Sequence, residues 1–345
     1  MSSLIPQTMW LSVQNMGFSS KHKQGLDLVV RIWGGLGNQM FGYAFAKALE
    51  HFTQDEVICE CSFFLTNKHT KDTPQPTIRN LELSSFALSL PLNLHFDSKA
   101  FFASYDSLFK LYRIYKNFIP KAYRRCGYRY AYEETPSLLS QVFYNPSSFP
   151  HYAYFYGYFH NLAYFAHITH QIRQDFTLLT PLSEINQKYK SLIKATPNAT
   201  FVHIRRGDYL LKQNEHFVRL GKSYYERAFV TLKQIYPNAH LFIFSNDISY
   251  CKAHFTKEST SNEHISTQGL EFSLIEGNDE GSAAQEMELM RSCENAIIAN
   301  STFSWWAAYL IENPHKIVIA PSVFLGTANP LHQSSLILPK EWIAL

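Results

Sequence analysis

A histidine, two arginines and an aspartate lie close together in the run His203–Asp208, which reads HIRRGD. The preceding residues, Thr200–Ile204, are typical of a strand, so the arginines follow at its carboxyl end. Open α/β sheets bind ligands at that end, and a guanidinium group is a donor fork suited to phosphate. Because side chains alternate along a strand, His203 and Arg205 are predicted to share one ligand, while Arg206 faces away. Taken alone, an Arg–Asp surface network around a turn explains this run at least as well.

A glycine-rich turn near the amino terminus is a second candidate. Strand, turn and helix are predicted in the order Leu26–Trp33, Gly34–Gln39 (GGLGNQ) and Met40–Phe52. This order opens a mononucleotide-binding unit. Glycines such as Gly35 and Gly37 let a ligand approach the backbone, and Asn38 can direct an amide into a cleft. Considered alone, the turn is better explained by tight packing of the helix on the strand.

A third candidate begins where the predicted strand 296–299 ends and a helix runs on through Leu310. Asn300, Ser301, Thr302 and Phe303 lie at this junction. Hydroxyl groups at a helix start can cap its free amides, and the same amides form an anion site. Simple capping is the alternative, but two hydroxyls, an aromatic ring and an amide are a richer set than capping needs.

Two acids accompany this junction. Asp247 follows the predicted strand His240–Phe244, and Glu286 lies in the helix before residues 296–299. A carboxylate can accept two hydrogen bonds from the Watson–Crick edge of guanine. Asp-x-Asp does not occur in the sequence, so no metal site of the usual sugar-diphosphate kind is predicted. Arginine and helix amides are expected to balance the leaving-group charge instead.

Strands alternate with helical patterns throughout the second half of the chain, which predicts a parallel sheet and an α/β fold. A composition shift near residue 180 marks a boundary. We therefore expect a flexible extension over residues 1–25, an amino-terminal domain over 26–180 and a carboxyl-terminal domain over 181–345.

The bulk composition excludes several classes of protein. At 345 residues, 46% hydrophobic and 17% charged, the chain can bury a large core and is not a disordered protein. A net charge of +3 is too small to predict a nucleic-acid partner. Five scattered cysteines without CxxC spacing are typical of reduced thiols, and no run of 18 apolar residues or signal peptide is found. These features predict a cytoplasmic location.

Two segments of the first half leave alternatives open. A basic helical pattern in 101–132 is either a solvated face or a peripheral contact with the anionic inner membrane surface, and it contains Lys110, Arg113, Lys116, Lys121, Arg124 and Arg125. The aromatic window His151–His167 can form core, or its tyrosines, over Tyr152–Tyr164, can form a sugar-binding wall.

The motifs GGLGNQMFGYAFAKAL, FVHIRRGDYL, FIFSND and EMELMRSCENAIIANSTFSWWAAYL occur in that order across residues 31–320. Together they resemble the α-1,2-fucosyltransferases. The resemblance implies a GT-B fold, with two Rossmann-like domains facing a cleft. It also implies GDP-fucose as donor, inversion at the anomeric carbon without a metal or other cofactor, and O2 of a terminal galactose as acceptor. The partner is then a galactose-terminated oligosaccharide or glycolipid.

The resemblance also assigns roles to residues. It implies that Arg205 holds the diphosphate and that Asn38 approaches the reacting centre. His203 and Glu286 are expected near guanine, although the family more often has Asp at the second position. The predicted donor-binding residues are His203, Arg205, Asp247, Glu286, Asn300, Ser301, Thr302 and Phe303, with Gly35 and Gly37 in the turn beside the phosphates. The predicted catalytic residues are Arg205, Asn38 and Asp208, the last as candidate general base, although a carboxylate paired with Arg206 would be a poor one.

Two other functions remain as alternatives. A catalytically inactive glycan- or sugar-nucleotide-binding protein on the same fold is one, but retention of Asn38, Arg205 and Asp208 argues against it. A nucleotide-dependent dehydrogenase is weaker, because the turn Gly34–Gly37 lacks the third glycine of the dinucleotide fingerprint.

Overall fold

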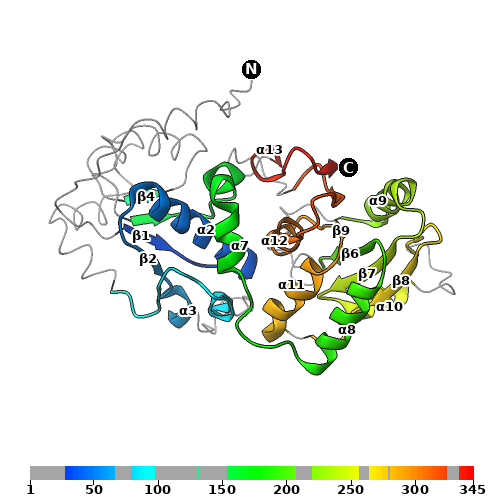
Figure 1. Cartoon of the computed structure of the whole chain (residues 1–345), viewed down its shortest axis with the longest axis horizontal. Coiled ribbons are helices and arrows are strands. Elements are labelled where there is room, and N and C mark those ends of the chain that lie inside the picture. The colour runs from blue at the N-terminus through cyan, green and yellow to red at the C-terminus, as the bar shows by residue number, and fades with distance from the viewer. Residues whose placement is uncertain are drawn as a thin grey trace, which may run out of the picture.

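Two parallel β-sheets, each with helices packed on it, form the protein (Figure 1). The computed structural model describes residues 28–66, 79–97, 130–132, 154–206, 220–255, 264–278, 280–324 and 334–345. The two sheets confirm the predicted α/β class with two Rossmann-like units.

The amino-terminal sheet has the strand order β3-β2-β1-β5-β4, and every pairing is parallel. Its strands are β1 (Leu28–Arg31), β2 (Val57–Glu60), β3 (Leu92–Asn93), β4 (Tyr130–Tyr132) and β5 (Tyr154–Tyr156). Its helices are α2 (Leu36–Thr53), α3 (Phe63–Thr66) and the 3-10 turn η1 (Glu82–Ser85). Helix α2 begins at Leu36, not at Met40 as predicted, so Gly37 and Asn38 belong to its first turn.

The carboxyl-terminal sheet has the order β11-β10-β9-β6-β7-β8, again with parallel pairings throughout. Its strands are β6 (Ala199–Ile204), β7 (His240–Ser245), β8 (Glu271–Leu274), β9 (Asn295–Ile297), β10 (Val318–Ala320) and β11 (Ile343–Ala344). The central strand β6 is buried along its whole length, as expected for a parallel strand covered on both faces. The strands predicted in this half are confirmed within one or two residues.

Helices cover this sheet and connect it to the first one. They are α8 (Glu184–Ala195), α9 (Lys222–Ile235), α10 (Ile248–His254), η8 (Glu280–Ser282), α11 (Ala283–Arg291), α12 (Thr302–Leu310) and α13 (Ser334–Ile337). The chain crosses between the halves through η4 (Leu162–Tyr164), η5 (Ala166–Ile168) and α7 (Thr169–Asp175). The domain boundary predicted near residue 180 falls in the connection between α7 and α8.

One hydrophobic cluster spans both halves of the molecule. Phe41 of α2 packs 4.8 Å from Trp305 and 5.0 Å from Trp306 of α12, measured between ring centroids. Phe165, in the crossover, stacks on Trp306 at 5.3 Å. Helix α12 therefore lies between the two sheets (Figure 1) and packs against α2 through buried aromatic rings.

The aromatic window of the sequence is mostly core. Five of its aromatic side chains are buried, namely Tyr154, Phe155, Phe159, Tyr164 and Phe165. The first four lie within 152–164, so the predicted sugar-binding wall is wrong for them. Their rings pack against α2 and the strands, which leaves none of their faces for a sugar. Among the described helices, none is long and apolar enough to cross a membrane. The basic pattern Lys110–Arg125 lies outside the described residues.

Candidate active site

The exit of strand β6 places its two arginines in different surroundings. The guanidinium of Arg206 lies 3.6 Å from the ring centroid of Tyr250, and its Nε is 3.4 Å from Asp247 Oδ2. The positive charge of Arg205 instead acts on His203 and Glu286. Its effect on each group is to lower the pKa, which opposes the effect of burial on Glu286. The two arginines thus have different neighbours, which agrees with the alternation along the strand.

His203 is buried beside Arg205. Only 3% of its surface is exposed, and its ring lies 5.8 Å from the ring of Phe303. Burial and the Arg205 charge lower the pKa of His203 to about 3, so its imidazole is neutral at physiological pH. Its Nδ1 has no hydrogen-bond partner within the described part of the chain. A buried neutral ring with an unpaired nitrogen can bind a polar ligand atom.

The two acids predicted to bind the donor have separate positions. Asp247 Oδ1 accepts a hydrogen bond of 3.1 Å from the backbone of Tyr250 and caps α10, while Oδ2 faces Arg206. Both of its oxygens are therefore engaged by the protein. Glu286 is half-buried in the first turn of α11, near Arg205. Burial raises its pKa to about 7, and the Arg205 charge opposes this rise.

The amino terminus of α12 is not capped by a side chain. Ser301 has the extended backbone of an N-cap residue, but its hydroxyl makes no capping hydrogen bond. Asn300 and Ser301 are both buried. Simple capping by the Ser301 hydroxyl is therefore not observed, and a helix start without such a cap suits an anionic ligand.

The glycine turn meets this helix end directly. A Cβ atom on Gly37 would lie 2.5 Å from the backbone nitrogen of Phe303 and 2.6 Å from Thr302 Oγ1, so no side chain fits there. Asn38 Oδ1 accepts hydrogen bonds from Thr302 Oγ1 at 2.9 Å and from His160 Nε2 at 3.1 Å. The start of α2 and the start of α12 thus lie against each other, and the glycine turn joins the α12 junction.

A cation lies beside the start of α2. Gly35, the N-cap residue of α2, has no side chain to cap the helix, and a Cβ there would lie 3.5 Å from Arg79 Nη1. At the start of α12, the Phe303 ring contacts His203, whose pKa the charge of Arg205 lowers. Two helix amino termini, each equivalent to roughly half a positive charge, therefore lie together near positively charged side chains. Such an arrangement suits an anion with more than one charged group.

Residues 28–345 match the family model described as glycosyl transferase family 11. The chain belongs to this family. This result favours glycosyl transfer over the dehydrogenase alternative.

Several relatives of this family 11 glycosyltransferase cover nearly the whole chain. An O-antigen biosynthesis glycosyltransferase of Escherichia coli is 28% identical over 340 residues, covering 90% of this chain and 98% of that protein. An alpha-1,2-colitosyltransferase of Escherichia coli is 28% identical over 340 residues, covering 92% and 98%. A galactoside 2-alpha-L-fucosyltransferase of Mus musculus is 26% identical over 310 residues, covering 87% and 69%.

Solved structures similar to this glycosyltransferase are more distant. A mutant of Arabidopsis thaliana FUT1 in complex with GDP has a TM-score of 0.47 and 13% identity, covering 96% of this chain and 78% of that one. The alpha-1,6-fucosyltransferase NodZ, soaked with GDP-fucose, has a TM-score of 0.41 and 13% identity, covering 86% and 95%. The fold assignment therefore rests on the two parallel sheets.

Two residues of this family 11 site escaped the sequence analysis. Gln39 is fully buried and binds the carbonyls of Gly34 and Asn80 through Nε2, at 2.9 and 2.8 Å. Its Oε1 accepts from the backbones of Glu82 and Leu83, so it fixes the segment that follows Arg79. His160 gave no signal because it is 122 positions from its partner Asn38. The candidate base Asp208 lies outside the described residues.

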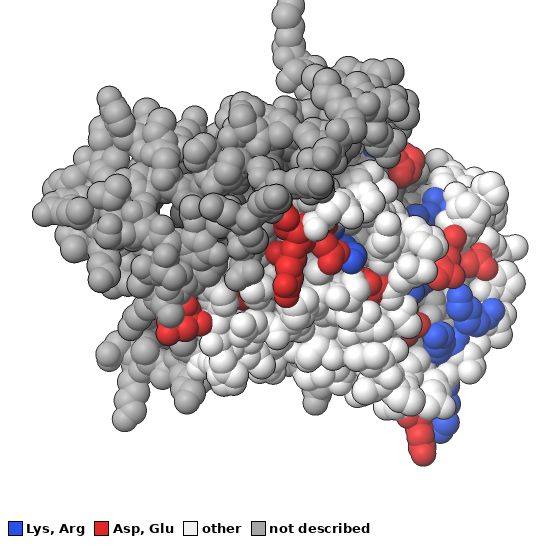
Figure 2. All heavy atoms as spheres, turned by 60° about the vertical axis from the view of Figure 1, so that its left-hand side comes forward, with Lys and Arg blue, Asp and Glu red and all other residues white. Residues whose placement is uncertain are grey.

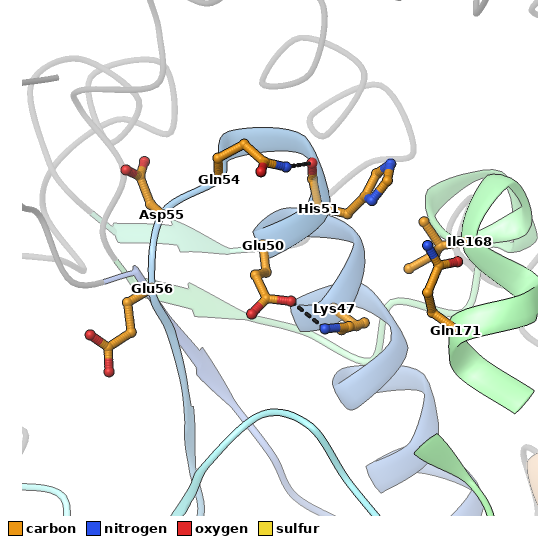
Figure 3. Close-up of a pocket in the computed structure, with 8 residues that line it drawn as sticks. All are labelled: Lys47, Glu50, His51, Gln54, Asp55, Glu56, Ile168 and Gln171. Atoms are coloured by element: carbon orange, nitrogen blue, oxygen red, sulfur yellow. Dashed lines mark hydrogen bonds and ion pairs between the residues drawn. The ribbon is translucent and has the colours of Figure 1, made fainter. Parts of the chain in front are cut away.

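A hollow of about 410 Å³ lies at the other end of α2 (Figure 3). It is lined by Lys47, Glu50, His51, Gln54, Asp55, Glu56, Ile168 and Gln171. Gln54 follows Asn38 by 16 positions, or about 24 Å along a helix, so this hollow is not part of the candidate site.

Within the described residues, no group of three His, Cys, Asp or Glu side chains could hold a metal ion. Acidic and basic side chains are interspersed on the described face in Figure 2.

Proposed function

We propose that this family 11 glycosyltransferase moves L-fucose from GDP-fucose to O2 of a terminal galactose, with inversion and without a metal ion. The contact between the starts of α2 and α12, neither of which has a side-chain cap, is the observation that carries the proposal. Two positive helix ends that adjoin each other repel weakly, and a bound diphosphate relieves this repulsion. The relatives named for alpha-1,2-colitosyl and galactoside fucosyl transfer support the choice of substrates.

The donor would lie along the exit edge of the carboxyl-terminal sheet. Its diphosphate would bind Arg205 and the amides at the start of α12. Its guanine would lie near His203 and Glu286, where a neutral imidazole and a carboxylate offer hydrogen-bond partners to the base. Guanine N–H groups require an ionised carboxylate, so donor binding is expected to lower the raised pKa of Glu286.

Transfer with inversion is a single displacement at the anomeric carbon. The galactose O2 forms the new bond to C1 while the bond from C1 to the diphosphate oxygen breaks. The bonding electrons leave with GDP, and the O2 proton passes to a base, for which Asp208 remains the prediction. As charge grows on the departing diphosphate, donors already aimed at it bind more strongly and lower the barrier.

The acceptor would bind on the amino-terminal half. Trp33, Tyr156 and Tyr158 are half-buried rings at the carboxyl edge of that sheet, where they lie close to His160 and Asn38. The galactose would belong to an oligosaccharide or glycolipid. A cytoplasmic location and peripheral contact of the basic segment with an anionic membrane stay predictions, which flotation with anionic liposomes can test.

A donor and acceptor screen tests the proposal. The purified protein is incubated with GDP-fucose, UDP-sugars and the colitose donor, with galactose-terminated acceptors, and the product linkage is determined. We expect an α-1,2-linked fucosyl product, no turnover of UDP-sugars and full activity in EDTA. Complete loss in EDTA that Mn²⁺ restores would contradict the metal-free mechanism. Tight GDP binding without hydrolysis or transfer would instead support the inactive binding protein.

A further inference from the structure

The side-chain amide of Asn38 is held by residues from both halves of the molecule. Its Oδ1 accepts one hydrogen bond from Thr302 Oγ1 at 2.9 Å and one from His160 Nε2 at 3.1 Å. An amide oxygen has two lone pairs, so these donors occupy its acceptor capacity. The Nδ2 atom faces the opposite way, and a side chain on Gly34 would lie 3.0 Å from it.

The segment that carries His160 is fixed in an unusual conformation. Phe159 has a φ of 55°, in the left-handed region that a bulky residue rarely adopts. Its buried ring stacks on Phe45 at 4.1 Å with an interplanar angle of 8°, which holds the backbone there. Such backbone conformations persist where the surrounding structure enforces them, and they concentrate at functional sites.

Further contacts clamp the same segment. Trp33 Nε1 donates to the carbonyl of Gly157 at 2.9 Å, and the Trp33 ring stacks on Tyr158 at 4.1 Å. The His160 ring stacks on Tyr158 at 5.1 Å and meets Phe41 edge-on at 5.0 Å. His160 is only 6% exposed, so its ring cannot rotate without displacing these neighbours. The direction of its Nε2 toward Asn38 is therefore set by packing.

We propose that His160 and Thr302 are positioning residues that leave the Asn38 amide with only N–H donors to offer. Those donors would bind an oxygen of the sugar-nucleotide diphosphate, which the starts of α2 and α12 attract to the same place. This inference rests on the proposed function for the identity of the ligand. It also excludes Asn38 as a hydrogen-bond acceptor for the galactose hydroxyl, so the proton must pass to another group.

The first test compares Asn38→Asp with Asn38→Ala. Aspartate keeps the shape and both accepted hydrogen bonds, but it replaces the N–H donors by a carboxylate oxygen. We expect Asn38→Ala to weaken GDP binding about tenfold and Asn38→Asp to weaken it further, because a carboxylate repels the diphosphate. Isothermal calorimetry with GDP measures both. If Asn38→Asp binds GDP as tightly as the wild-type protein, the donor role of Asn38 is wrong.

The second test isolates His160. His160→Phe keeps the ring contacts with Tyr158 and Phe41 but removes the donor, whereas His160→Gln supplies an amide donor. We expect the Phe variant to weaken GDP binding about threefold to tenfold and the Gln variant to recover most of this loss. In the Asn38→Ala background, His160→Phe should cost nothing more, since it acts through the amide. A purely structural role would give the same loss in both backgrounds and would overturn the inference.

A matched control and the wild-type protein separate the two proposals. His170→Phe changes an exposed histidine of α7 and should leave GDP affinity and transfer rate unchanged. If the Asn38 and His160 variants lose GDP affinity as expected but the wild-type protein transfers no fucose, the proposed reaction is wrong and the role of His160 stands. If it transfers fucose while the Asn38 and His160 variants bind GDP normally, only this inference is wrong.

Discussion

The two ends of helix α12 differ in whether side chains bind their free backbone groups. At its carboxyl terminus, Lys316 Nζ donates to the carbonyls of Ala308, Tyr309 and Ile311 at 2.8, 3.0 and 2.9 Å. Arg173 of α7 adds hydrogen bonds of 2.7 Å to the carbonyls of Leu310 and Tyr309. The free carbonyls and the negative end of the helix dipole are thus satisfied by two cations.

At its amino terminus, the same helix lacks a side-chain cap. Ser301 has the right backbone and the right side chain for one, yet makes no capping bond, and Thr302 turns its hydroxyl to Asn38. A capping bond there is usually worth about 1 kcal/mol, and this chain does without it. The carboxyl end is therefore satisfied by the protein itself, whereas the amino end lacks a side-chain cap and is the end that we propose to bind a ligand.

The largest expected effect is on the transfer rate and concerns the amino-terminal end of α12, where we propose that the ligand binds. Arg205→Ala removes the donor that we propose for the diphosphate, so transfer should slow by about 10²–10³, or roughly 2.7–4 kcal/mol of barrier. Arg205→Lys should recover only part of this, because it keeps the charge but loses the planar fork. Steady-state kinetics and GDP affinity measure the loss.

Arg206→Ala is the matched control for this variant. Because Arg206 packs on Tyr250 and pairs with Asp247, its loss should lower the melting temperature. Any fall in its rate should accompany that instability. If Arg205→Ala keeps wild-type turnover while a fully folded Arg206→Ala has none, the roles are exchanged.

The next largest effect is on stability and concerns the carboxyl-terminal end of α12. Lys316→Met removes three part-buried hydrogen bonds to carbonyls at this helix end, so the free energy of unfolding should fall by about 1–3 kcal/mol. GDP affinity of the folded protein should stay unchanged, since the change lies at the far end of the helix. Denaturant unfolding measures the first quantity and calorimetry the second. Lys252→Met, which breaks an exposed ion pair with Glu276, should cost no more than about 0.5 kcal/mol.

A smaller effect depends on pH. The folded pKa of Glu286 is raised to about 7 from 4.5, so its contribution to stability is full below pH 4.5 and is lost as pH rises through 7. Relative to Glu286→Gln, the ligand-free wild-type protein should therefore lose stability over that range. GDP affinity should show the reverse trend and increase with pH only in the wild-type protein. Equal pH profiles of GDP affinity for the two proteins would show that Glu286 does not contact guanine.

The smallest effect should come from Ser301. At an ordinary N-cap, Ser→Ala costs about 1 kcal/mol. Here the hydroxyl makes no capping bond, so Ser301→Ala should change the free energy of unfolding by less than about 0.5 kcal/mol. A loss near 1 kcal/mol or more would mean that the amino end of α12 is capped after all, and the contrast between its two ends would disappear.

Much of the site could be predicted from short stretches of sequence. The run His203–Arg206 placed a histidine and two arginines at the end of a strand, and alternation separated Arg205 from Arg206. The strand before Asn300 and the helix after it were also predicted. The start of α2 was not, because glycine and asparagine are poor helix formers and only the contact with α12 explains Gly37 in its first turn.

By itself, the sequence determined several strands and helices, most of them in the carboxyl-terminal half, together with the family motifs and the side-chain types at the exits of those strands, because these depend on neighbours a few residues apart. Only the tertiary structure decided which of those side chains meet. Asn38 reaches Thr302 across 264 positions, and Arg173 reaches Leu310 across 137. Such pairs carry no local pattern, since the path of the chain brings them together. For the same reason, only the structure decided which end of α12 is satisfied by side chains and which lacks a side-chain cap.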